Sequence, residues 1–175
     1  EWDDPRMSTS STDFITKLAR LPLRNHPGEA WGYSFASDVL GVVIERITGL
    51  SLADFLRTAL FEPLEMVDTS FAVPAHKHHR LASSHRWDAP SQVLKLVEER
   101  YDSDQAYRVN GFESGGSGLI STAPDYGRFL EMLRNGGRYG DKQILSPKLV
   151  RYMGQDHLPG SITDANVGPN HDRSL

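Results

Sequence analysis

Residues 27–35 read Pro-Gly-Glu-Ala-Trp-Gly-Tyr-Ser-Phe and run directly into an apolar-periodic stretch over residues 36–48. Apolar side chains recur there at helical spacing, and Gly49 follows as a residue type common just past a helix end. The sequence therefore predicts a helix over residues 36–48, with Trp31 and Tyr33 just before it. Aromatic residues in such a place are ordinarily part of the core. The alternative is that Tyr33 lies at the helix start with its hydroxyl in a cleft.

Local start and stop residues predict further helices on both sides of this one. Two capping boxes, each a hydroxyl residue followed three residues later by an acidic one, open two of them. These boxes are Ser51 with Asp54, ahead of a helix through Leu60 that Pro63 closes, and Thr122 with Asp125, ahead of a helix that Gly136-Gly137 stop. A shorter helix is expected from Ser11 or Thr12 to Pro22, and another from Ser146-Pro147 onward.

The helix that follows Thr122 is expected to bury a stripe made of Tyr126, Phe129, Leu130 and Leu133. Other stretches are less periodic. Residues 73–92 favour a loop with one or two short extended pieces, and residues 93–101 are compatible with helix or strand. The chain as a whole is typical of a helix-rich piece of an α+β protein.

Composition excludes several classes of function. The chain has 175 residues, a formal net charge of -4 and no cysteine. The negative net charge does not indicate a nucleic-acid-binding protein. The absence of cysteine excludes disulfides, thiolate zinc sites and a cysteine nucleophile. No apolar run approaches the roughly 18 residues of a membrane span. Neither the compartment nor the oligomeric state follows from these totals.

Two clusters invite a chemical interpretation that the residues do not favour. His76, His78 and His79 would need to share one face of a strand to bind a metal, and Lys77 and Arg80 add positive charge among them. We expect a solvated or structural segment there and no metal. Ser117, in Gly115-Gly116-Ser117-Gly118, lacks the glycine two residues later that a nucleophile elbow requires. A tight turn with close backbone approach is the favoured interpretation.

Several ordered blocks of the chain resemble the β-lactamase-related serine hydrolases, which comprise class C β-lactamases, D-alanyl-D-alanine peptidases and esterases of the same fold. The blocks are P-G-E-A-W-G-Y-S, L-G-V-V-I-E-R-I-T-G and F-E-P-L-E-M-V-D-T-S-F between residues 27 and 71, then G-G-S-G-L-I-S-T-A-P-D-Y-G-R-F-L-E-M-L-R-N-G-G, then I-L-S-P-K-L-V-R-Y-M. The resemblance covers most of residues 11–153. It implies the helix-rich central part of that α+β fold, without most of its antiparallel sheet.

The resemblance also implies a role for Tyr33. In that family a serine of S-x-x-K attacks the acyl carbonyl, a tyrosine of Y-x-N or Y-S-x moves the proton, and K-T-G or H-x-G completes the site. Tyr33 matches the tyrosine, as general acid and base. A tyrosine phenol is protonated at neutral pH, so this role requires cationic neighbours that stabilise the phenolate.

The other two family motifs are absent from these residues. The residues three positions before the lysines are Phe14, Pro74, Gln92, Tyr139 and Leu145, so no lysine completes S-x-x-K. His26-Pro27-Gly28 has the form H-x-G but precedes the tyrosine instead of following it. We therefore expect residues 1–175 to be a partial domain, inactive alone, that exposes apolar faces and aggregates.

Phe35 occupies the place where β-lactamases and peptidases keep asparagine. Its ring offers an apolar surface and no amide hydrogen bond, so Phe35 is predicted to contact substrate and to favour esters over lactams. The expected activity is that of a carboxylesterase with an acyl-enzyme intermediate, acting on a small-molecule ester or lactam without metal or organic cofactor. The alternatives are a β-lactamase or D-alanyl-D-alanine carboxypeptidase, and a non-catalytic relative that binds peptides or acyl ligands.

Overall fold

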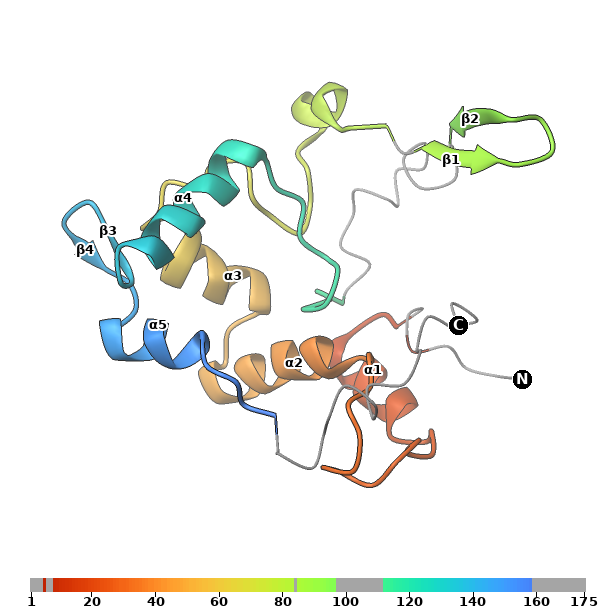
Figure 1. Ribbon diagram of the computed structural model, residues 1–175, viewed down its shortest axis with the longest axis horizontal. Helices are drawn as coiled ribbons and strands as arrows, with labels where there is room; N and C mark the ends of the chain where they lie inside the picture. The colour runs from red at the N-terminus through yellow and green to blue at the C-terminus, as the bar shows by residue number, and fades with distance from the viewer. Residues whose placement is uncertain (1–4, 6–7, 84, 97–111, 159–175) are drawn as a thin grey trace.

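A computed structural model describes residues 5, 8–83, 85–96 and 112–158 of the chain (Figure 1). Helices account for most of the regular structure. The α-helices are α1 (Ser11–Leu18), α2 (Ala36–Thr48), α3 (Leu52–Leu56), α4 (Ala123–Arg134) and α5 (Pro147–Met153). A π turn, η2 (Arg57–Phe61), and a 3-10 helix, η3 (Ala75–Arg80), join them. The strands are β1 (His85–Asp88), β2 (Val93–Leu96), β3 (Arg138–Tyr139) and β4 (Lys142–Gln143).

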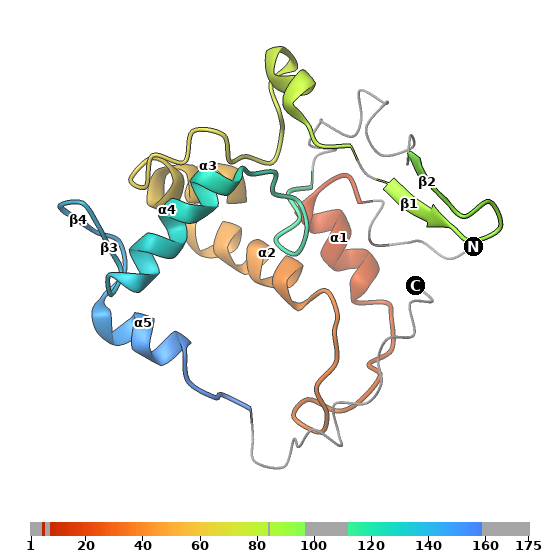
Figure 2. The ribbon, with the colours of Figure 1, turned by 45° about the horizontal axis from the view of Figure 1, so that its top comes forward.

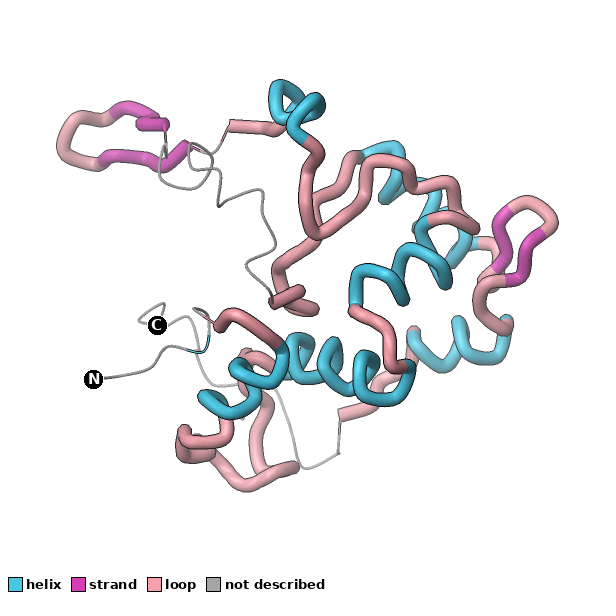
Figure 3. Tube along the Cα trace, turned by 180° about the vertical axis from the view of Figure 1, so that it is seen from behind, coloured by secondary structure: helices cyan, strands magenta, loops and turns pink. Residues whose placement is uncertain are grey.

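Strands occur in the described residues only as two antiparallel hairpins, β1–β2 and β3–β4, drawn in magenta in Figure 3. Trp87 faces Leu94 in the first hairpin, so the stretch that the sequence left open between helix and strand is a strand over Val93–Leu96. Residues 97–101, for which the same question stood, lie outside the described residues. The fold is therefore helix-rich with little sheet, as expected.

Most predicted helix starts are confirmed by hydrogen bonds of the capping residues. Ser51, Thr122 and Ser146 each accept a hydrogen bond from the backbone N–H three residues later. The first helix differs from its prediction. Its capping residue is Ser10, whose hydroxyl accepts from the N–H of Asp13, and it ends at Leu18 because the next residues turn with tighter hydrogen bonds.

The helix that starts after Ser51 is shorter than predicted. Its α-helical part ends at Leu56, and the next turn widens until the N–H of Glu62 bonds to the carbonyl of Arg57, 2.9 Å away. A widened turn of this kind is a π turn. It leaves the side chain of Phe61 buried in the core.

The main core forms where this widened turn meets α4 (Figure 2). Its buried members are Phe61, Leu64, Met66 and Met132. The predicted buried stripe of α4 is partly wrong: Tyr126 is 56% and Leu130 48% exposed, whereas Asp125 and Met132 are buried. The helix is rotated so that Asp125, Phe129 and Met132, at i, i+4 and i+7, lie on the inner face.

A second apolar contact joins α1 to residues distant in the sequence. The ring of Phe14 is fully buried and stacks on Phe112, with ring centroids 4.5 Å apart. Phe14 also meets Phe35 edge-on at 5.7 Å. This cluster fixes the start of α2 against α1. No helix in the described residues is long and apolar enough to cross a membrane.

Candidate active site

Tyr33 lies in the loop between α1 and α2, three residues before the helix begins. Its side chain is 84% exposed, and within the described residues it makes no hydrogen bond or ion pair. The expectation of a buried core aromatic is therefore wrong for Tyr33. Its hydroxyl is free to contact a bound molecule, which is the first requirement of the proton-transfer role predicted for it.

Phe35 is the residue immediately before α2 and is half-buried. Its ring packs edge-on against Phe14, with the ring planes at 75°. The backbone at Phe35 turns into the helix without a side-chain cap. Phe35 thus anchors the segment that carries Tyr33, and its predicted contact with substrate stays a prediction.

A glycine loop, residues 113–118, packs on the first turns of α2, as Figures 1 and 2 both show. A Cβ at Gly115 would overlap the carbonyl oxygen of Ser37, and one at Gly116 would lie 2.6 Å from a carboxylate oxygen of Asp38. The predicted close backbone approach is confirmed. Ser117 also lacks the strand–turn–helix setting of a nucleophile elbow, since α4 begins only at Ala123.

Asp38 is the residue that fastens this loop, and sequence analysis missed it. The carboxylate is buried, and one oxygen accepts hydrogen bonds from the Ser114 hydroxyl at 2.5 Å and the Gly116 N–H at 3.2 Å. Ser114 lies 76 positions away in sequence. The only local indication was an acidic residue in the first turn of an apolar helix, where it also suits the helix dipole.

The other end of the loop is fixed by Glu113. Its carboxylate accepts a hydrogen bond from the N–H of Ala53 at 2.5 Å, at the start of α3. Carboxylates are favourable at this place because the first N–H groups of a helix have no partner within the helix. The glycine loop is therefore held between α2 and α3, next to the segment that presents Tyr33.

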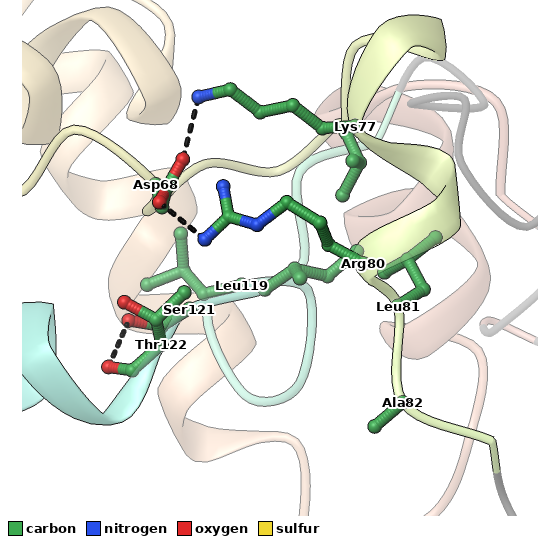
Figure 4. A pocket seen from close by; sticks show the side chains of 10 residues that line it. Asp68, Lys77, Arg80, Leu81, Ala82, Leu119, Ser121 and Thr122 are labelled. Atoms are coloured by element: carbon green, nitrogen blue, oxygen red, sulfur yellow. Dashed lines mark hydrogen bonds and ion pairs between the residues drawn. The ribbon is translucent and has the colours of Figure 1, made fainter.

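A separate pocket of about 460 Å³ lies beyond the glycine loop (Figure 4). Its lining residues include Asp68, Lys77, Arg80 and Leu119. Lys77 and Arg80 both pair with Asp68, at 2.5 and 2.8 Å. Hydrogen bonds from Arg80, then from Lys77, hold the pKa of Asp68 well below its usual range. Lys77 and Arg80 are thus both engaged in ion pairs with Asp68.

The histidine segment beside this pocket is a 3-10 helix and not a strand, so alternate residues do not share a face. His78 contacts the carbonyl oxygen of Val73 through its Nε2 at 2.9 Å. Within the described ranges, no group of three or more His, Asp or Glu side chains is arranged to hold a metal ion. The segment serves instead to bring Lys77 and Arg80 to Asp68.

The family model described as Beta-lactamase matches residues 1–168 of the chain. The chain belongs to this family. Protein Rv1367c of Mycobacterium tuberculosis is 37% identical to it, over 83% of this chain and 35% of its own length. Esterase EstB of Burkholderia gladioli is 32% identical, over 69% of this chain and 33% of its own length.

The solved structure of EstCE1, a hydrolase with promiscuous acyltransferase activity, superimposes with a TM-score of 0.69 at 25% identity. The superposition covers 82% of this chain and 39% of EstCE1. Other members similar to this chain include acyltransferases and a carboxypeptidase-like protein. The chain spans about a third of the length of the curated relatives it matches.

Proposed function

We propose that the protein carrying this chain is a serine hydrolase of the Beta-lactamase family, and specifically a carboxylesterase that forms an acyl-enzyme intermediate. The observation that carries the proposal is the placement of Tyr33. Tyr33 is exposed, makes no hydrogen bond within the described residues, and lies three residues before α2, whose first turn is hydrogen-bonded to the glycine loop. A proton-transfer group needs an accessible hydroxyl on a fixed support, and this arrangement supplies both.

In the proposed reaction Tyr33 moves one proton through each half of the cycle. As phenolate it takes the proton of the nucleophilic serine while that oxygen attacks the ester carbonyl. It then gives the proton to the departing alkoxide, which leaves as the alcohol. In the second half it takes a proton from water, which attacks the acyl-enzyme, and returns it to the serine oxygen.

The proposal requires a nucleophilic serine in the S-x-x-K spacing and a cationic neighbour of the Tyr33 phenolate, and within the described residues no cationic side chain pairs with Tyr33. No lysine of the chain completes the S-x-x-K spacing. The nucleophile and the positive charge that stabilises the phenolate must therefore come from other residues of the protein. The test has to be made on the complete polypeptide that contains this chain.

Ester substrates are favoured over lactams because of Phe35. Phenylalanine has no side-chain donor or acceptor, so residue 35 offers no hydrogen bond to an amide group of a substrate. Its ring packs edge-on against Phe14. The ester specificity is supported by the similarity to Esterase EstB and to EstCE1. A β-lactamase or D-alanyl-D-alanine carboxypeptidase is the alternative within the family.

The two activities are separated by comparing turnover of p-nitrophenyl butanoate with turnover of a cephalosporin by the complete protein. We expect a higher kcat/KM for the ester by at least about 100-fold, corresponding to roughly 3 kcal/mol of transition-state binding. A preference for the cephalosporin would reverse the assignment. Turnover of neither substrate would identify a non-catalytic relative and overturn the proposal.

A further inference from the structure

The glycine loop carries two hydroxyl groups that are connected to one buried carboxylate. The Ser114 hydroxyl donates to Asp38 at 2.5 Å. Ser114 Oγ in turn accepts the backbone N–H of Ser117 at 3.1 Å and lies 3.2 Å from Ser117 Oγ. Ser117 itself is exposed. These contacts connect the buried carboxylate of Asp38, through the Ser114 hydroxyl, to the exposed hydroxyl of Ser117.

The direction of these hydrogen bonds follows from the number of protons available. A serine hydroxyl has one proton and two lone pairs. Since Ser114 gives its proton to Asp38, it can only accept from Ser117, so the Ser117 hydroxyl donates inward. The lone pairs of Ser117 Oγ are then left facing outward. Ser117 thus presents a fixed hydrogen-bond acceptor at the surface of the loop.

This acceptor lies close to the segment that presents Tyr33. Gly115 and Gly116 pack directly on Ser37 and Asp38. Tyr33 precedes Ser37 by only four residues. Ser117 therefore belongs to a loop that packs on the turn of α2 directly following the Tyr33 segment.

We propose that Ser117 Oγ accepts a hydrogen bond from a second hydroxyl on the alcohol part of the ester, which makes this protein selective for esters of diols and polyols. The inference rests on the proposed esterase function. An acceptor recognises a donor, and a simple acyl chain has no O–H or N–H group. The donor must therefore belong to the alcohol, either as it leaves or as it enters in acyl transfer.

The test compares two esters that differ in this donor alone, 2-hydroxyethyl butanoate and 2-methoxyethyl butanoate, with the complete protein. We expect kcat/KM to be about 3- to 10-fold higher for the hydroxyethyl ester, the effect of one neutral hydrogen bond. Ser117→Ala should abolish this preference and leave turnover of the methoxyethyl ester within about 2-fold of wild type. Ser114→Ala should weaken the preference, because the Ser117 proton is then no longer held inward.

Ser37→Ala is the matched control, since Ser37 is an exposed serine at the same end of α2. It should keep the preference. A preference that survives in Ser117→Ala, an equal loss for both esters, or no preference in the wild type would overturn the inference while leaving the esterase assignment intact. If the wild type turns over neither ester, the proposed function fails, and the inference fails with it.

Discussion

At the scale of single residues, Asp68 is the point on which two cationic side chains converge. It lies between the main core and the 3-10 helix, and both carboxylate oxygens are paired, one with Lys77 and the other with Arg80. Its backbone N–H donates to the buried carboxylate of Asp125 at 2.7 Å. Asp68 thus connects η3, the turn after Met66 and α4 through side-chain and backbone hydrogen bonds.

The lowered pKa of Asp68 predicts a loss of stability in acid. The ordinary value is 3.8, and hydrogen bonds from Arg80 and Lys77 hold the pKa of the folded state below it. The stabilisation is therefore complete above the pKa of the unfolded chain and is lost as the pH falls below about 4 toward the folded value. Asp68→Asn should flatten this acid limb in urea unfolding of the complete protein between pH 6 and pH 2.5. An unchanged acid limb would show that the two ion pairs contribute no pH dependence.

Residues with long-range partners were the ones that the sequence could not identify. Tyr33 and Phe35 were selected because they stand in a motif, and an accessible Tyr33 hydroxyl was one of the two interpretations that the sequence left open. Asp38 and Asp125 are buried because of partners 57 to 78 positions away. Spacing along one helix carries no information about such partners, so Asp125 was expected only as part of a capping box and Asp38 was not singled out.

At the scale of elements, short-range chemistry sets the ends of helices and hairpins. The capping boxes at Ser51 and Thr122 depend on contacts within three residues, and the sequence predicted both. The π turn after α3 was not predicted, because it depends on packing of Phe61 in the core. The rotation of α4 was missed for the same reason: burial of Met132 and Asp125 is decided by neighbouring elements.

The β3–β4 hairpin contains two glycines that should respond differently to substitution. Gly137 has a φ of 88°, and a Cβ there would overlap the carbonyl of Leu145. Gly140 has a φ of 57° with open space around it. Gly140→Ala should lower the free energy of unfolding by about 1 kcal/mol, the cost of left-handed backbone. Gly137→Ala should cost more than about 3 kcal/mol, because a clash with backbone adds to that strain.

Urea unfolding of the complete protein measures both glycine variants. Equal destabilisation by the two substitutions would mean that the carbonyl of Leu145 moves aside at little cost. The same experiment with wild-type protein fixes the reference for both values.

At the scale of the whole molecule, the described residues leave apolar helix faces uncovered. On α2, Leu40 is 59% and Ile47 79% exposed, although their spacing is that of a buried stripe. Tyr126 and Leu130 are uncovered on α4. The sequence identified these side chains as apolar faces, and the α+β class and family were correct. The segments that pack on these faces could not be inferred from the sequence pattern. An apolar stripe on a helix predicts that the stripe is buried, but it does not identify what packs on it.

The exposed face of α2 predicts that the isolated 175-residue chain self-associates. We expect concentration-dependent association in sedimentation velocity and a broad thermal transition. Ile47→Lys should reduce the association, since a charge at this position opposes burial. Thr48→Lys, a charge on the next exposed residue, serves as the control for net charge. A monodisperse wild-type chain with a sharp, cooperative transition would contradict this prediction.

The central claim is that Tyr33 transfers protons, and Tyr33→Phe in the complete protein tests it most directly. The measurement is kcat/KM, which reports the acylation half of the reaction, for ethyl butanoate and for p-nitrophenyl butanoate. We predict a loss of at least about 100-fold for the ethyl ester. The loss should be smaller for the p-nitrophenyl ester, because p-nitrophenolate leaves without a proton. The melting temperature should not change, since the hydroxyl is exposed and unpaired among the described residues. Wild-type turnover of ethyl butanoate by Tyr33→Phe would contradict the account.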